Sequence, residues 1–152
     1  MSVAFRRDSD DEHKEPVFEL PIPAGPNLVT ERGLALIAAR VADLKAAIAA
    51  EADEEARKKL EREARYWGTQ QATAQLAPPP EPGVAGIGSR VTIRREGREQ
   101  AFGITGHDEA DPAQALVAFT APLARAVMGA EAGERVDFAG VDDAIEVLEV
   151  TP

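Results

Sequence analysis

The sequence predicts an α+β protein in which an antiparallel helical hairpin precedes a domain built from an antiparallel sheet and one short helix. Three observations predict this class. Apolar residues recur at helical spacing over residues 30–76, a proline-rich stretch follows at residues 77–83, and apolar residues then alternate with polar ones in short runs. A chain of 152 residues has room for one small domain and one extended element.

Composition restricts the partners and the chemistry of the chain. The formal net charge is -10 and the pI is near 4.7, so we expect no direct binding to nucleic-acid phosphates, because no surplus of basic side chains exists to displace counterions. The absence of cysteine excludes disulfides and zinc sites built from thiolates. No apolar run has the length of a signal peptide or a membrane span, so we expect a cytoplasmic protein with no membrane partner.

Residues 1–26 form an acidic, proline-rich segment that we expect to be a mobile arm. Carboxylates are concentrated between Asp8 and Glu15, and prolines follow from residue 16 to residue 26. Such a segment buries too little apolar surface to offset the entropy of ordering it. Its apolar residues, such as Phe18 and Ile22, could still dock on a surface of the folded part.

A coiled-coil stripe predicts the first helix. Thr30 is a suitable N-cap, and the apolar residues after it are spaced alternately by three and four positions: Leu34, Ile37, Val41, Leu44 and Ile48. The same register continued past Ala50 would place charged side chains on the seam, which an apolar partner helix would not accept. We therefore expect this helix to end near Ala50.

A second stripe, in a different phase, predicts the second helix. Asp53 is its N-cap, and its seam consists of Ala56, Leu60, Ala64, Trp67, Gln71 and Ala74. We expect Trp67 to be a packing anchor of the seam. Two helices with one apolar seam each and a short link between them pack as an antiparallel hairpin, which we assign to residues 27–76. The alternative is one continuous helix, because residues 51–55 contain neither glycine nor proline.

The chain after the hairpin follows the two-residue period of strands. Residues 77–83 end the second helix and act as a linker, since proline lacks an amide hydrogen and clashes with the preceding helical turn. In residues 84–152 the alternating apolar pairs are Val91 and Ile93, Phe102 and Ile104, Val117 and Phe119, Val136 and Phe138, and Ile145 and Val147. Glu96-Gly97-Arg98 predicts the first hairpin turn, and Pro122 with Gly129 frames a helix of two turns.

Two stretches of the sequence carry a resemblance to a known family. The longer one contains a strand ending in Ile104-Thr105-Gly106, the acidic loop Asp108-Glu109-Ala110-Asp111, a further strand, Ala121-Pro122-Leu123-Ala124-Arg125-Ala126, and a Gly-Glu-Arg-Val turn. The shorter one is Asn27-Leu28-Val29-Thr30-Glu31-Arg32-Gly33. In this order they resemble the C-terminal domain and the start of the first helix of the Gre-family transcription elongation factors, which bind bacterial RNA polymerase. The resemblance covers roughly residues 27–150.

The resemblance implies a fold, a partner and a binding surface. Residues 84–152 should adopt the FK506-binding-protein-like fold of the family, and the protein should regulate transcription elongation from the secondary channel of the polymerase. The surface implied for docking on the β′ rim helices consists of Asp108, Glu109, Asp111, Pro122, Leu123 and Arg125. The alternative is that the loop is a solvated turn and that Leu123 belongs to the core. Ala121 stands where family members usually have serine, which removes a polar contact or a helix cap.

The tip of the hairpin distinguishes two functions. In the Gre factors that stimulate transcript cleavage, the tip carries an Asp-Leu-Lys-Glu-Asn-Ala-Glu-Tyr motif, whose acids help to hold a second Mg²⁺ that activates the attacking water. This sequence lacks the motif. With about 20 residues per arm the hairpin spans about 30 Å, several helical turns less than in the cleaving members. We therefore expect a regulator without cleavage-stimulating tip chemistry.

Four acids are expected at this tip: Glu51, Asp53, Glu54 and Glu55. We interpret Asp53 as a helix cap, with Glu54 and Glu55 opposing the positive end of the helix dipole. Metal binding is the alternative for the cluster. We expect no cofactor of the protein's own, and Mg²⁺ shared with the polymerase would be involved only if the tip reaches the active centre. The rival function is a cleavage factor whose tip is rebuilt around Asp53 and Glu54.

Other chemistry has little support in the sequence. His107 beside Asp108 is a weak indication of an acid–base or metal site, since the other histidine, His13, lies in the arm. No glycine-rich phosphate loop or nucleophile motif occurs, so we expect no enzymatic activity. A remote alternative is a peptidyl-prolyl isomerase, suggested only by the implied fold. It would need an aromatic pocket, whereas the strand pattern assigns the phenylalanines of residues 84–152 to the core.

Overall fold

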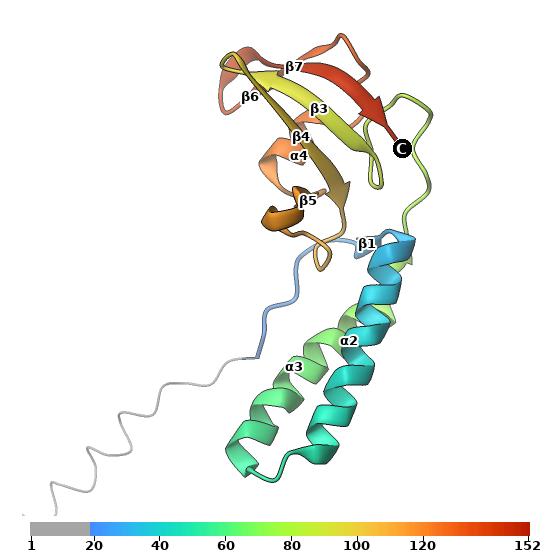
Figure 1. Ribbon diagram of the computed structural model, residues 1–152, viewed down its shortest axis with the longest axis vertical. Helices are drawn as coiled ribbons and strands as arrows, with labels where there is room; N and C mark the ends of the chain where they lie inside the picture. The colour runs from blue at the N-terminus through green and yellow to red at the C-terminus, as the bar shows by residue number, and fades with distance from the viewer. Residues whose placement is uncertain (1–18) are drawn as a thin grey trace, which may run out of the picture.

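The computed structural model describes residues 19–152 and has two parts, a helical hairpin and a five-stranded sheet domain. The hairpin projects away from the sheet, and its turn lies at the far end of the molecule (Figure 1). The predicted α+β class and the hairpin are confirmed. Of the expected arm, residues 1–18 lie outside the described residues, and residues 19–26 reach the hairpin base without helix or strand. No helix within residues 19–152 has the length and apolar character needed to cross a membrane.

Both hairpin helices begin at the predicted caps. Helix α2 spans Glu31–Ala50, and the hydroxyl of Thr30 accepts a hydrogen bond from the amide of Gly33 at 3.0 Å. Helix α3 spans Glu54–Thr73, and the carboxylate of Asp53 accepts one from the amide of Ala56 at 2.9 Å. The alternative of one continuous helix is wrong, because Glu51 leaves helical geometry at φ -85° and ψ 119°.

The seam between the helices follows the predicted stripes, except for one shift on α3 and for Leu34 on α2, which is 38 % exposed. Ile37 and Leu44 are buried on α2, and Trp67 is half-buried on α3. At the base of α3, Gln70 is buried and Gln71 is exposed, so the predicted place of Gln71 on the seam is wrong. The shift arises because this end of α3 faces the sheet domain as well as α2.

Trp67 connects the two helices. The guanidinium carbon of Arg40 on α2 lies 5.7 Å from the centre of the indole ring, within the range of a cation–π contact. Tyr66 packs edge-on against the same ring at a centroid distance of 5.3 Å. These contacts agree with the expected role of Trp67 as a packing anchor.

A two-stranded sheet that the sequence analysis did not anticipate closes the hairpin base. Strand β1 (Leu28–Val29) pairs in parallel with β2 (Gln75–Leu76). The amides of Gln75 and Ala77 donate to the carbonyls of Asn27 and Val29 at 2.9 and 2.8 Å. Strands of two residues carry no periodic signal, which is why the pattern did not reveal them. The two ends of the hairpin are thus tied together.

The sheet of the second domain is mixed, so the prediction of a purely antiparallel sheet is wrong at one edge. The order is β5-β4-β3-β7-β6, and only β4 and β5 are parallel. The acidic loop and the 3-10 helix η2 (Pro112–Gln114) return the chain along β4 before β5 begins, which permits this pairing. The strands are β3 (Arg90–Arg95), β4 (Arg98–Thr105), β5 (Leu116–Ala118), β6 (Arg135–Phe138) and β7 (Val141–Thr151).

Two tight turns join antiparallel neighbours. Glu96 and Gly97 connect β3 to β4 with φ values of 52° and 75°, and Ala139 and Gly140 connect β6 to β7 with 52° and 79°. Positive φ at both central residues gives the type I′ turn, whose twist matches that of the paired strands. The predicted turn at Glu96-Gly97-Arg98 is therefore confirmed.

Helix α4 (Pro122–Val127) packs on the sheet and completes the core. Proline opens the helix, and Gly129 follows it with a φ of 83°. Ala121 makes no side-chain cap hydrogen bond, as its identity implies. The buried core contains Ile93, Phe102, Ile104, Ala124, Val127, Ile145 and Val147, and Phe119 and Phe138 pack against it.

The proline-rich segment lies against the sheet domain. A Cβ added to Gly86 would lie 2.7 Å from Cβ of Pro80, and the amide of Ala85 donates to the carbonyl of Ala130 at 2.9 Å. The link between the two parts is thus packed at its C-terminal end.

The close approach of the two parts at Gly106 can be tested. A Cβ on Gly106 would lie 2.5 Å from the carbonyl oxygen of Leu28, because the chain leaving β4 passes directly beside β1. Gly106→Ala should therefore lower the free energy of unfolding, by about 1–3 kcal/mol. Gly68→Ala in α3 is the control, since its new Cβ meets open space, and it should raise the free energy by up to about 1 kcal/mol. Urea unfolding measures both, and an unchanged stability of Gly106→Ala would contradict the contact.

Candidate functional site

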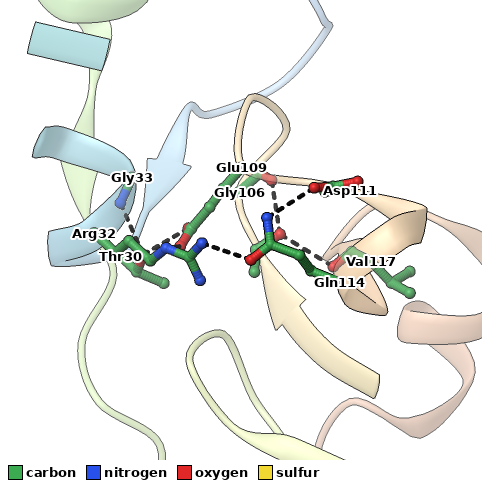
Figure 2. Close-up of polar contacts among 9 residues, drawn as sticks. Thr30, Arg32, Gly33, Gly106, Glu109, Asp111, Gln114 and Val117 are labelled. Atoms are coloured by element: carbon green, nitrogen blue, oxygen red, sulfur yellow. Dashed lines mark hydrogen bonds and ion pairs between the residues drawn. The ribbon is translucent and has the colours of Figure 1, made fainter. Parts of the chain in front are cut away.

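The acidic loop between β4 and η2 reaches the base of the hairpin. Two of its carboxylates, those of Asp108 and Glu109, accept hydrogen bonds from side chains of the hairpin. Figure 2 shows Glu109 directed at the N-terminal end of α2. The loop that was expected to bind a partner is therefore, within this chain, the contact between its two parts. We call this contact the junction.

Glu109 is buried at the start of α2. Its side chain is 5 % exposed, and its Oε1 lies 3.9 Å from Nε of Arg32. Its Oε2 accepts a hydrogen bond from the hydroxyl of Thr30 at 2.6 Å. The same hydroxyl accepts from Gly33, so the carboxylate extends the cap of the helix, where the dipole favours a negative charge. Its burial contradicts the expectation that Glu109 is an exposed binding charge.

Asp108 binds the base of α3. Its Oδ1 accepts a hydrogen bond from the hydroxyl of Tyr66, and its Oδ2 accepts one from the side-chain amide of Gln70 at 2.7 Å. Gln70 is 1 % exposed, so without this bond its amide would lack water as well as a partner. The side chain of Asn27 in turn donates to the backbone carbonyl of Gln70 at 3.0 Å. The loop thus contacts both helices of the hairpin.

The contact with Asp108 affects the ionisation of Tyr66. Burial raises the pKa of Tyr66, and the hydrogen bond to Asp108 and the negative charge of that carboxylate raise it further. The folded chain therefore favours the neutral phenol, which is the form that can donate to Asp108.

The remaining residues of the predicted binding surface are not all free. Asp111 caps η2 by accepting a hydrogen bond from the amide of Ala113 at 3.0 Å. Its other oxygen accepts from Gln114, whose side-chain oxygen accepts from Arg32 at 2.9 Å, so Asp111 supports the junction indirectly. The other members lie on α4: Pro122 and Arg125 are exposed and Leu123 is half-buried.

His107 connects the loop to the segment before α4. Its Nδ1 lies 3.4 Å from the hydroxyl of Thr120, and its ring lies 5.3 Å from that of Phe119. Its Nε2 is buried and has no hydrogen-bond partner among residues 19–152. The neighbouring carboxylates of Asp108 and Glu109 bind the hairpin instead. In the part of the chain that the structure describes, no three histidine, aspartate or glutamate side chains gather as a metal site.

The acids at the hairpin tip interact locally. Asp53 caps α3, and Glu51 accepts a hydrogen bond from the amide of Asp53 at 3.1 Å. Glu54 and Glu55 lie 3.7 and 3.9 Å from Nζ of Lys58. The predicted cap at Asp53 is confirmed, and the exposed pairs with Lys58 contribute little to stability.

Sequence reasoning missed the hairpin side of the junction. Thr30 was identified only as a helix cap, and Tyr66 and Gln70 received no role at the junction. Their partners lie far away along the chain, 79 residues for Thr30 and 42 for Tyr66.

Comparison with known proteins gives one family. A sequence model described as transcription elongation factor, GreA/GreB, C-terminal, matches residues 79–152. Among curated proteins, none matches the chain. Two similar solved structures are Gfh1, a GreA factor homologue of Thermus thermophilus, and a GreA/GreB elongation factor from Nitrosomonas europaea. Their identities are 12 % and 18 % and their TM-scores 0.39 and 0.41, over 84 % and 85 % of this chain and 100 % of each of theirs.

Titration of Tyr66 tests the junction, because it is the only tyrosine of the chain and phenolate absorbance therefore reports on it alone. The folded protein should titrate well above the ordinary tyrosine pKa of about 10, and urea should restore about 10. Stability from this contact should be complete below pH ~10 and decline above it, because the unfolded chain ionises first. Asp108→Asn should lower the folded pKa, and Glu54→Gln at the tip should leave it unchanged. An identical midpoint in Asp108→Asn and wild type would refute the contact.

Proposed function

Because residues 79–152 match the model of the C-terminal domain of the GreA/GreB transcription elongation factors, we propose that this protein binds bacterial RNA polymerase and regulates elongation from its secondary channel. In this proposal the sheet domain docks on the β′ rim helices at the channel entrance, and the hairpin enters the channel. The protein then works in the cytoplasm, where the polymerase is.

The family match carries the proposal. The junction supports it, because it would let a docked domain set the direction of the hairpin. Glu109 holds the first turn of α2, and Asp108 holds the base of α3. Contacts to two helices restrict rotation as well as translation of the hairpin. A domain bound at a channel entrance could therefore direct the hairpin inward without ordering a flexible link first, and the entropy of that step would not oppose binding.

The docking surface in this proposal lies on α4 and beside it. Pro122 and Arg125 are exposed, Leu123 is half-buried, and Met128 is 39 % exposed just after the helix. A small apolar patch with one cation at its side suits a helical partner that offers apolar and acidic side chains. In this proposal Asp108 and Glu109 do not contact the polymerase. They contribute to binding indirectly, by positioning the hairpin.

We propose further that the protein competes with cleavage factors and does not act as one. Each hairpin helix has 20 residues and is therefore about 30 Å long. At the tip Asp53 caps α3, Glu51 accepts a hydrogen bond from the amide of Asp53, and Glu54 and Glu55 lie beside Lys58. Within residues 19–152 the tip acids do not gather as a metal site. In this proposal the protein has no catalytic residue or cofactor of its own, and Mg²⁺ belongs to the polymerase.

The two rival functions have weaker support. A rebuilt cleavage tip would have to take Asp53 from its capping bond and Glu54 from Lys58. A peptidyl-prolyl isomerase would need an aromatic pocket, whereas Phe102 is buried and Phe119 and Phe138 pack against the core.

Backtracked elongation complexes distinguish the proposed function from the rebuilt tip. With this protein added, the RNA should be cleaved no faster than by polymerase alone, because the tip supplies no ligand for the second metal ion. The same complexes should respond less to an added Gre factor, since both occupy one channel. The lengths of the RNA 3′ fragments over time measure both effects.

The control for this experiment is the double variant Asp53→Ala with Glu54→Ala. It should compete nearly as well as wild type, with a loss of about 1 kcal/mol in hairpin stability from the missing cap. Faster cleavage by the wild type, abolished in the double variant while polymerase binding persists, would replace our proposal with the rebuilt tip.

A further inference from the structure

A groove of about 500 Å³ lies beside the junction, where the hairpin base, the proline-rich segment and the end of β7 meet. Its lining is largely apolar and includes Leu76, Val84, Ile87 and Val150. Leu76 is 52 % exposed. A concave apolar surface that leaves a leucine in water favours an apolar occupant.

The charges of the groove are of one sign. Glu31, in the first turn of α2, and Glu81, in the proline-rich segment, both line it, and no lysine, arginine or histidine does. Within residues 19–152 neither carboxylate forms an ion pair. The complementary occupant therefore combines an apolar side chain with adjacent positive charge.

The backbone beside the groove suits an extended peptide. The amides of Gln75 and Ala77 both donate to β1. Successive amides of a strand point to opposite edges, so the amide of Leu76 points to the other, unpaired edge of β2. A peptide can add to such an edge through its main chain while one of its side chains fills the neighbouring pocket.

We propose that residues 3–7 of this same chain, Val-Ala-Phe-Arg-Arg, occupy the groove, with Phe5 in its apolar part and Arg6 and Arg7 facing Glu31 and Glu81. This stretch belongs to the segment that precedes the described residues, and there it alone places an aromatic residue next to two arginines. The acids that follow, from Asp8 to Glu15, are repelled by the acidic groove and stay outside it. The proposal does not depend on the proposed function.

The chain between the two sites is long enough for this contact. Glu19 is tied to Arg65 of α3 by an ion pair of 2.6 Å. From Arg65 to Leu76 the path along the end of α3 and into β2 measures about 22 Å, and the chain from Arg7 to Glu19 spans up to about 40 Å when extended. Phe18, the other aromatic residue of the segment, is the direct neighbour of Glu19 and has no such reach.

The contact would act as a strap across the junction. Glu31 and Leu76 belong to the hairpin base, whereas Ile87 and Val150 belong to the sheet domain. A segment seated between them touches both parts and restricts their relative motion. It does so independently of Asp108 and Glu109, because it uses other residues on both sides.

A spin label tests the strap directly, since a chain without cysteine accepts a single label at Ser2→Cys. In the full-length protein the oxidised nitroxide should broaden the amide signals of Leu76, Val84 and Ile87 until most of their intensity is lost, and reduction of the label should restore them. Signals of the hairpin tip, at Ala52, should keep their intensity.

Two triple variants of the labelled protein give the matched comparison. Phe5→Ala with Arg6→Ala and Arg7→Ala should restore most of the lost intensity. Asp8→Ala with Asp10→Ala and Asp11→Ala also replaces three side chains of the same segment by alanine. This variant should leave the broadening in place. Equal broadening in the first variant and in wild type would overturn the proposal, as would intact groove signals in wild type.

A mixing experiment separates the chain's own segment from that of a second copy. Isotope-labelled protein without a spin label is mixed with spin-labelled protein without isotopes, so that only contacts between molecules cause broadening. The strap predicts full intensity at the groove in this mixture. Broadening at Leu76 and Ile87 there, as strong as in the doubly labelled protein, would show that the groove binds another molecule and would overturn the intrachain contact.

Discussion

Two adjacent carboxylates at the end of β4 determine how the two parts of this chain fit together. Three of the four oxygens of Asp108 and Glu109 accept hydrogen bonds from hairpin side chains, and the fourth faces Arg32. A small displacement of the hairpin would break these hydrogen bonds without giving water access to the carboxylates. A buried charge would then have no partner, which is energetically costly. Gly106 adds a steric restriction, because a side chain at this position would collide with the backbone of β1.

The same arrangement explains how the small sheet domain can set the direction of the long helical hairpin. The hairpin helices are joined by Trp67 and Arg40 along their seam, by β1 and β2 at their base, and by the junction to the sheet. Movement of the domain is thus transmitted to a tip about 30 Å away, because the 20-residue helices between them are regular throughout. A partner that binds the sheet domain would thereby also set the direction of the tip.

Local features of the sequence were predictable, and long-range ones were not. The caps at Thr30 and Asp53 are hydrogen bonds between residues three positions apart. The strands show themselves by alternation of apolar and polar residues over a few positions. Both features could therefore be recognised in the sequence. The parallel pairing of β5, the two-residue strands and the burial of Gln70 depend on segments that meet only in the folded chain. The family resemblance identified the acidic loop as important, but the hydrogen bonds of Asp108 and Glu109 to the hairpin, across 38 to 79 residues, leave no trace in local sequence.

If Asp108 and Glu109 hold the hairpin in one direction, the distance between its tip and the sheet domain should be narrowly defined. Spin labels at Ala52→Cys in the tip turn and Arg98→Cys at the start of β4, both exposed, should give one narrow distance distribution by double electron–electron resonance. Adding Asp108→Ala and Glu109→Ala should broaden the distribution several-fold, while Asp142→Ala and Glu149→Ala, which remove two exposed acids from β7, should leave it narrow. Distributions of equal width in the two variants would show that Asp108 and Glu109 do not set the direction of the hairpin.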